Sequence, residues 1–346
     1  MYIESIKISG FRNIKGSESY RFINKKNLIY GSNGSGKTSI IEAIYVLGFG
    51  RSFLSVKKKE LLSFDSDRFF IDSSLIRSGL KFNISAVMNN KFSLFLDEEK
   101  TTISGIGESF FPLFFSSNDY VQLIASKSNL RRLFDKLIFG VHSFYSDELI
   151  QYKKIIKNKS FLLKHNPEKQ HLIGWNKLLA EYILNITKRR FGFVKEINDF
   201  LKKNYHKGIE VKYSPSTKEF TDDNDFNIGI VNNSLDELLE KEILYKNTLI
   251  GSHLDKYEIY LNKRPLRMFS SGEKKLNLLF IYLAYIELFL SVRKEYPVFL
   301  IDDYDIAMDE SNKAMLMEKY PDMQIIATSV RKNKDFDNII ELKNPR

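Results

Sequence analysis

The chain has 346 residues, of which 43% are hydrophobic, and its Lys and Arg exceed its Asp and Glu to give a formal net charge of +10. This length and composition are those of a globular protein with one or two domains, and they exclude wholesale disorder. The absence of cysteine excludes disulfides, thiolate metal sites and cysteine nucleophiles. The positive charge favours a polyanionic partner, either nucleic acid or a membrane surface.

No membrane-spanning or secretory segment is expected. Glu287 and Arg293 interrupt the longest apolar runs before they reach the length of about 18 residues that crosses a bilayer. The first residues lack the basic start and apolar middle of a secretory signal. We therefore expect a cytoplasmic protein with no membrane partner.

The first motif along the chain is a glycine-rich loop between a short apolar strand, Leu28–Tyr30, and a segment with apolar residues at helical spacing. This is the context that the pattern G-x-x-x-x-G-K-[ST] requires, because its backbone N–H groups converge on phosphates at a helix N-terminus. We predict a nucleoside triphosphate site, with Lys37 at the β- and γ-phosphates and Thr38 as a Mg²⁺ ligand. The predicted phosphate-binding residues are Gly31, Ser32, Asn33, Gly34, Ser35, Gly36, Lys37, Thr38 and Ser39.

Strands and then helices follow the loop. The segments "FFIDSSLIR", "LKFNISAVMNN" and "KFSLFLDEE" alternate partly with period two, which predicts an antiparallel layer up to about residue 115. Charged helical stretches occupy 116–205, and five apolar residues at three- and four-residue steps predict a buried helix face there: Leu178, Leu179, Tyr182, Ile183 and Ile186. The predicted domains are therefore 1–115, an inserted lobe at 116–205, and 206–346, with a mobile loop at 217–227.

A buried strand followed by acids comes near the C-terminal end. Val298–Ile301 is a continuous apolar run, as in central parallel strands, and Asp302 and Asp303 follow it. Beside a phosphate loop, Asp302 is predicted to hold the metal and Asp303 to orient or deprotonate the attacking water. The alternative for such an acid pair is an N-cap and a first-turn charge on the next helix.

Several segments resemble known families. Ser270-Ser271-Gly272-Glu273, before an apolar helical segment, resembles the signature of ABC-type ATPases, and Gly10-Phe11-Arg12-Asn13 resembles the first strand end of their chromosome-maintenance branch. Segments 125–138 and 251–259, together with "IDDYDIAMDE", resemble the RecF family of bacterial recombination ATPases, with Asp309 at the D-loop aspartate. These segments cover most of the chain in the family's order.

The resemblance implies an α/β fold, namely an ABC-type P-loop ATPase head with an antiparallel β layer and an inserted helical lobe. It implies that Arg12, Asn13 and Asp309 belong to the nucleotide site, and that Ser270 and Gly272 cap the ATP bound by a second copy. The implied function is recombinational gap repair and replication: an ATP-dependent homodimer grips double-stranded or gapped DNA, without sequence preference, and slow DNA-stimulated hydrolysis releases it. Other recombination mediator proteins are implied partners.

The chain departs from the family pattern at a few positions. Ile306-Ala307-Met308 replaces S-E-L of the D-loop, Leu254 replaces an arginine, and Glu273 ends a signature that reads S-Q-G-Q in RecF. Because of these changes, the resemblance does not imply a particular rate of ATP hydrolysis. A transporter ATPase subunit of the ABC type is the alternative function, although the interval between phosphate loop and signature is longer than such subunits need.

Three positive clusters are candidate DNA contacts, with solvated faces as the alternative: Lys57–Lys59, Lys127 with Arg131 and Arg132, and Lys188–Arg190. His253 either lies near the nucleotide or is a hydrogen-bonded structural histidine. Scattered histidines and the lack of cysteine give no indication of a transition-metal site.

Overall fold

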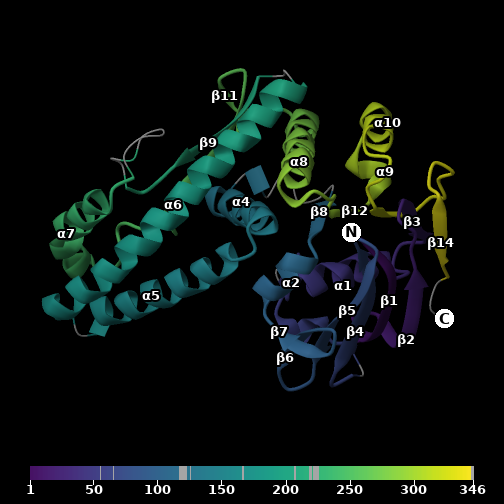
Figure 1. Cartoon of the computed structure of the whole chain (residues 1–346), viewed down its shortest axis with the longest axis horizontal. Coiled ribbons are helices and arrows are strands. Elements are labelled where there is room, and N and C mark those ends of the chain that lie inside the picture. Colours follow the sequence, from purple (N-terminus) through teal and green to yellow (C-terminus); the bar gives the residue numbers. More distant parts are fainter. Residues whose placement is uncertain are drawn as a thin grey trace. The chain divides into compact units, whose positions relative to one another are not determined.

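A computed structural model of the chain describes residues 1–54, 56–64, 66–116, 123–124, 126–165, 167–205, 208–217, 220 and 226–343. The contacts divide it into two compact units, each with its own sheets and helices (Figure 1). The first unit joins Met1–Tyr120 to Phe289–Arg346, and the second unit is Val121–Leu288.

The first unit contains a parallel sheet of five strands in the order β14-β3-β13-β12-β8. Its strands are β3 (Lys26–Gly31), β8 (Pro112–Ser116), β12 (Val298–Asp302), β13 (Ile325–Ser329) and β14 (Asn338–Leu342). The predicted acid strand is β12, whose residues are all buried, because it pairs with β13 on one side and β8 on the other. The carboxyl ends of β3, β13 and β12 therefore meet at one edge, where α/β folds bind ligands.

A six-stranded antiparallel sheet completes the first unit, in the order β2-β1-β4-β5-β6-β7. Its strands are β1 (Tyr2–Phe11), β2 (Ile14–Arg21), β4 (Phe69–Arg77), β5 (Leu80–Met88), β6 (Phe92–Leu96) and β7 (Glu99–Thr101). This sheet is the antiparallel layer predicted from the alternation, and β4, β5 and β6 follow the three predicted segments closely, whereas β7 was not predicted as a separate strand.

Helix α1 (Lys37–Phe49) packs against strands of both sheets. Most of its residues are buried, so it is apolar on nearly all sides, as a helix covered by two layers must be. The other helical elements of this unit are η1 (Lys58–Leu61), α2 (Ile103–Ser109), α9 (Tyr304–Ala307) and α10 (Glu310–Lys319).

The second unit combines helices with a three-stranded antiparallel sheet in the order β11-β10-β9. Its elements are α4 (Lys127–Val141), α5 (Tyr145–His165), α6 (Lys169–Tyr205), β9 (Ile209–Ser214), α7 (Ile228–Tyr245), β10 (Lys256–Leu261), β11 (Arg264–Pro265), η2 (Leu266–Met268) and α8 (Ser271–Arg293), the last extending past the unit boundary. The predicted helical stretches correspond to α5 and α6. On α6, Leu179, Ile183 and Ile186 are buried, whereas Leu178 is 42% exposed because it lies off the stripe that these three residues form.

The second unit extends further along the chain than the predicted lobe at 116–205. Strand β9 pairs with β10 and packs on α6, so residues beyond 206 join the helices. The three-part division stays a prediction, and the loop predicted at 217–227 lies largely outside the described residues.

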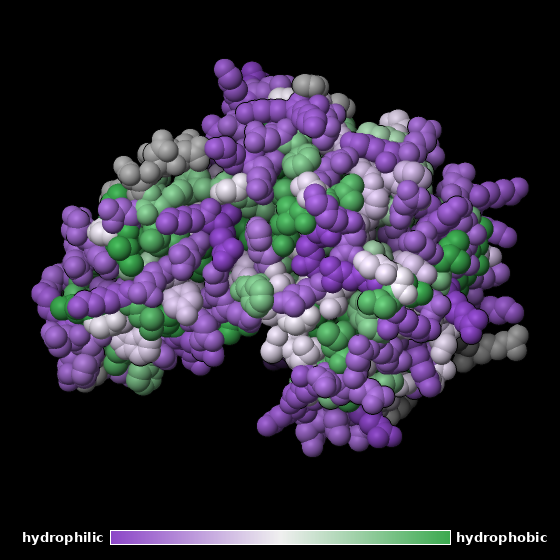
Figure 2. All heavy atoms as spheres, in the orientation of Figure 1, coloured by the Kyte–Doolittle hydropathy of each residue, from purple (hydrophilic) through white to green (hydrophobic). Residues whose placement is uncertain are grey.

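Helix α8 is long and apolar enough, by length and composition, to cross a bilayer, in contrast to the expectation that no such segment exists. In the 18-residue stretch of α8 that meets this criterion, 67% is buried inside the protein, as in the core helix of a globular fold. The face drawn in Figure 2 carries mostly hydrophilic side chains, with hydrophobic ones in scattered patches.

Candidate nucleotide-binding site

The phosphate loop connects the end of β3 at Gly31 to the start of α1 at Lys37. Gly34 and Gly36 have φ of 83° and 98°, in the left-handed region that favours glycine. A Cβ on Gly36 would also lie 3.0 Å from Nδ2 of Asn13. The positive φ therefore favours glycine at position 36, and a larger residue there would also displace the Asn13 side chain.

Lys37 lies against its own loop. Its Nζ donates hydrogen bonds of 2.8 Å to the carbonyl oxygens of Gly31 and Ser32, and the residue is only 6% exposed. Burial lowers the pKa of Lys37, while the carboxylates of Asp303 and Asp302 raise it. The buried hydroxyl of Ser35 has no hydrogen-bond partner among the described residues. A cation and an unsatisfied hydroxyl thus stand where the predicted phosphates would bind.

The predicted metal residues, Thr38 and Asp302, meet at the carboxyl end of the parallel sheet. Thr38, at the start of α1, donates from its hydroxyl to the two carboxylate oxygens of Asp302 at 3.3 and 3.4 Å. The hydroxyl of Thr328, on β13, donates to Oδ1 of Asp302 at 2.6 Å. Two residues that are 264 positions apart in the sequence therefore form one hydroxyl–carboxylate pair, the donor set that Mg²⁺ prefers.

Asp303 follows directly and takes a left-handed conformation, with φ 53° and ψ 53°. Its N–H donates to the Thr328 hydroxyl at 2.9 Å. It holds the N-cap position of α9, but its side chain makes no capping hydrogen bond there. Its position thus agrees with the N-cap alternative, while its side chain does not perform that role.

Arg12 and Asn13 lie next to the loop. Asn13 donates from Nδ2 to the Gly34 carbonyl at 3.3 Å and accepts a 2.8 Å bond from the Ser39 hydroxyl. Arg12 forms a bidentate ion pair with Glu42 of α1, with both bonds at 2.7 Å, and this pair raises the pKa of Arg12. Asn13 thus touches the phosphate loop directly, whereas Arg12 is held by Glu42, and a nucleotide role for either stays a prediction.

The signature begins α8 in the second unit. Ser270 donates from its hydroxyl to Oε2 of Glu273 at 2.7 Å, and the Ser270 N–H donates to the same oxygen at 3.0 Å. The Glu273 N–H donates to the Ser270 hydroxyl at 3.3 Å, and these reciprocal bonds form a capping box. Open space surrounds Gly272 on the side where a Cβ would project.

Asp309 is the N-cap of α10 and accepts bonds from the Asn312 N–H at 2.9 Å and from Nδ2 of Asn312 at 2.7 Å. These bonds lower the pKa of Asp309. Within this chain Asp309 therefore caps a helix, and its D-loop role at the nucleotide stays a prediction.

Comparisons with known proteins agree with the geometry. The family model described as RecF/RecN/SMC N terminal domain matches residues 2–342. A protein named DNA replication and repair protein RecF from Acetivibrio thermocellus is 30% identical over 98% of this chain and 97% of its own length. The chain belongs to the RecF family. RecF of Clostridium perfringens is 29% identical over 95% of this chain and 92% of its own.

Solved structures of RecF family members are also similar. The structure of the recombination mediator protein RecF with ATP in the RecFOR pathway has a TM-score of 0.89 and 26% identity, covering 99% of this chain and 97% of that one. An Smc head bound to the C-terminal winged-helix domain of ScpA, at 16% identity and a TM-score of 0.55 over 99% of this chain and 94% of that one, shares the fold alone. The predicted fold class and family are therefore confirmed.

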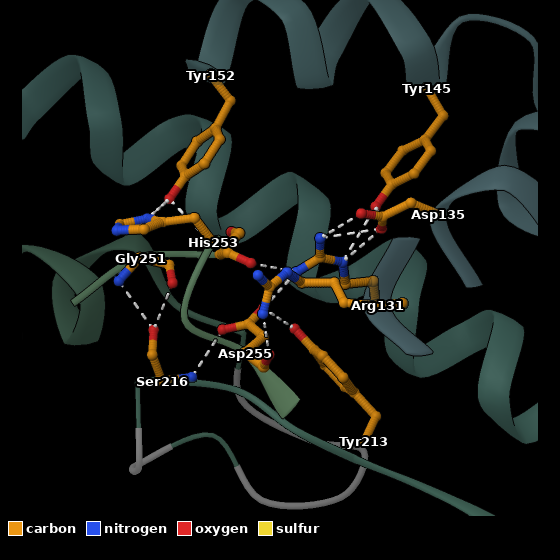
Figure 3. Close-up of polar contacts among 11 residues, drawn as sticks. Arg131, Asp135, Tyr145, Tyr152, Tyr213, Ser216, Gly251, His253 and Asp255 are labelled. Atoms are coloured by element: carbon orange, nitrogen blue, oxygen red, sulfur yellow. Dashed lines mark hydrogen bonds and ion pairs between the residues drawn. The ribbon is translucent and has the colours of Figure 1, made fainter. Parts of the chain in front are cut away.

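The two segments that resemble RecF segments, 125–138 and 251–259, meet in the second unit (Figure 3). Arg190 of α6 is buried and donates to Oδ2 of Asp255 at 2.6 Å and to Oδ1 of Asp135 at 2.9 Å. Arg131 donates to the Asp255 carbonyl at 2.7 Å. These residues form an ionic core in which Arg190 and Asp255 are buried and Arg131 and Asp135 are partly exposed, so removal of either buried partner would leave an unpaired buried charge.

His253 belongs to the same core. Its Nδ1 lies 2.6 Å from the Tyr152 hydroxyl and its Nε2 lies 3.1 Å from the Thr248 hydroxyl, so both ring nitrogens have partners. Burial lowers the pKa of His253 to about 4, helped by the positive charge of Arg131. These contacts favour the structural histidine of the two alternatives.

The predicted positive clusters differ in how much charge they expose. In the third cluster, Arg190 is buried, Arg189 pairs with Glu148 at 2.8 Å, and Lys188 lies over the Phe226 ring. Lys57–Lys59 is exposed. A run of cations in the sequence is therefore not necessarily a positive surface.

Sequence reasoning missed two residues that contact the site. Glu42 holds Arg12 and also accepts a hydrogen bond from Ser52. Thr328 contacts both predicted acids. Thr328 lies near the carboxyl end of β13, and its proximity to the acids follows from the pairing of β13 with β12, which no local motif indicates.

Proposed function

We propose that this chain is a slow, DNA-stimulated ATPase that acts in recombinational gap repair and DNA replication. ATP binding pairs two copies, the pair grips DNA, and hydrolysis releases it. The observation that carries the proposal is the meeting of the phosphate loop, Thr38 and Asp302 in a chain that is similar over 98% of its length to a DNA replication and repair protein.

The residues fit ATP with Mg²⁺. Thr38 and Asp302 are the residues that would hold Mg²⁺, which supplies charge neutralisation at the β- and γ-phosphates. The loop N–H groups and Lys37 bind the phosphates, for which Lys37 exchanges its bonds to the Gly31 and Ser32 carbonyls. Asp303 orients the attacking water and accepts its proton.

A second copy completes the site through its signature. Ser270 precedes α8 and Gly272 lies in its first turn, where the helix dipole favours an anion, and Ser270 exchanges its capping bonds with Glu273 for bonds to the phosphate. Since Ser270 and Gly272 are exposed, they are accessible to a phosphate from outside the chain. ATP shared between two copies makes pairing depend on nucleotide.

DNA is the proposed polyanionic partner, double-stranded or gapped, and the net charge of +10 supports it. Phosphate contacts position a protein without reading sequence, so no sequence preference is expected. We place the protein in the cytoplasm, with other recombination mediators as partners. The transporter alternative is not supported, because the relatives are named as replication and repair proteins.

The proposal is tested by sedimentation and ATP turnover, each with and without duplex DNA. We expect a monomer that dimerises with ATP and hydrolyses it faster on DNA. Lys37→Ala removes the cation at the phosphates and should abolish both nucleotide binding and dimerisation. Glu310→Gln, a change of an exposed charge, serves as the control. A wild-type chain that stays monomeric with ATP and ignores DNA would refute the proposal.

A further inference from the structure

Thr328 occupies an unusual place at the end of β13. Its side chain is 0% exposed. Its hydroxyl donates to Oδ1 of Asp302 at 2.6 Å and accepts from the N–H of Asp303 at 2.9 Å. One hydroxyl from a neighbouring strand therefore contacts both acids that the proposed reaction uses.

These two bonds act on different properties of the acids. A hydroxyl has a single proton, so the bond to Asp302 commits it and fixes the rotation of that carboxylate. The Thr38 hydroxyl approaches the same carboxylate from α1. The orientation of the Asp302 oxygens toward a metal is therefore set from two sides, by Thr38 and Thr328.

The bond to Asp303 acts on the backbone. Asp303 has φ 53°, a left-handed conformation that is uncommon for residues other than glycine and that Asp and Asn adopt most often among them. The Thr328 hydroxyl accepts the N–H at this turn. Loss of that acceptor leaves the N–H unpaired and releases the turn that aims the Asp303 side chain.

The adjacent hydroxyl has a separate role. Ser329 donates to the carboxylate of Asp305 in α9 and accepts from the N–H of Arg331 at 2.8 Å. No bond between Ser329 and Asp302 or Asp303 is found in the described part of the chain. Among the bonds described, Thr328 therefore contacts both acids, whereas its neighbour Ser329 contacts neither.

We infer that Thr328 is a positioning residue for Mg²⁺-dependent ATP hydrolysis, which orients the metal-facing carboxylate of Asp302 and the backbone of Asp303. The inference rests on the proposed function. It predicts that the Thr328 hydroxyl contributes to the part of ATP affinity that depends on Mg²⁺, as well as to turnover.

The test compares the affinity for a fluorescent ATP analogue in Mg²⁺ with that in EDTA. Thr328→Val keeps the shape and removes the hydroxyl, and should lower the ratio of these affinities roughly 10- to 100-fold, the usual effect of losing a partner of a metal ligand. Thr328→Ser keeps the hydroxyl and should retain the wild-type ratio. ATP turnover should follow the same order.

Ser73→Ala is the matched control, because Ser73 is also fully buried in the first unit and its hydroxyl bonds only to the Ser5 carbonyl among the contacts described. It should leave the ratio unchanged. Should Thr328→Val not fold, Thr328→Cys, whose thiol is a weaker donor, must give a ratio below that of wild type and of Thr328→Ser.

The outcomes separate the inference from the proposed function. A Thr328→Val protein with the wild-type ratio, or a Ser73→Ala protein with the same loss, would overturn the positioning role alone. A wild-type protein that binds ATP equally in Mg²⁺ and EDTA would also overturn the positioning role, whereas one that neither dimerises with ATP nor responds to DNA would overturn the proposed function as well.

Discussion

Asp303 can be tested without disturbing its backbone. Asn adopts the left-handed conformation about as readily as Asp, so Asp303→Asn removes the charge without adding strain at φ 53°. We expect ATP turnover to fall by about 100-fold or more, the usual contribution of a general base, while ATP still binds and the dimer accumulates. Phosphate release and sedimentation measure the two effects. Asp305→Asn is the control, and normal turnover in Asp303→Asn would show that another group orients the water.

At the scale of single residues, site residues could be predicted from the sequence where a motif defines the spacing between them. The phosphate loop and the acids after the buried strand could be predicted because one short segment contains each pattern. Glu42 and Thr328 could not, since their partners, Arg12 and Asp302, are distant in the sequence and no motif joins them. Only strand order makes Thr328 a neighbour of the acids.

At the scale of elements, the ionic core of the second unit predicts a dependence of stability on pH. His253 has a pKa of about 4 in the folded chain, below its ordinary value of 6.5. The unfolded chain therefore binds more protons between these values, so the contribution of His253 is complete above pH 6.5 and is lost as pH falls toward 4. The loss amounts to about 2 kcal/mol at pH 5.

Urea unfolding at pH 7.5 and pH 5 measures this effect. The difference between the two free energies of unfolding should be smaller in His253→Gln by that amount, because an amide does not titrate in this range. Replacement of the exposed His171, whose ring pairs with Glu168 at the surface, controls for histidine titration in general. An equal pH dependence in wild type and His253→Gln would contradict the assignment.

Helices and strands could be predicted where the hydrophobic periodicity lies within one short segment of the sequence. The strands of the antiparallel layer and the helices α5 and α6 follow from alternation and from helical spacing. The pairing of β9 with β10, across a gap that contains α7, depends on contacts that no local pattern encodes. The extent of the second unit was therefore the part of the fold that sequence reasoning could not supply.

At the scale of the whole molecule, the charge of +10 leads to a prediction about DNA binding. With about 6–10 phosphate contacts, the DNA affinity of the ATP-bound dimer should fall roughly 10³- to 10⁵-fold between about 50 and 200 mM salt. Duplexes of unrelated sequence should bind equally well. Fluorescence anisotropy across a salt series measures this, with ADP as the control nucleotide. Binding that ignores salt, or that selects one sequence, would contradict a phosphate-based grip.

The order of strands in the parallel sheet also bears on how the protein is made. Strand β3, which leads into the phosphate loop, lies between β13 and β14, so both of its neighbours come from the last strands of the chain described. At about 5–20 residues per second, a ribosome takes on the order of 15–60 s to proceed from the loop to β14. The second unit lies wholly within that interval and emerges before β12, β13 and β14. The nucleotide site is thus assembled late in synthesis, and until then the unpaired backbone N–H and C=O groups of β3 need protection from aggregation.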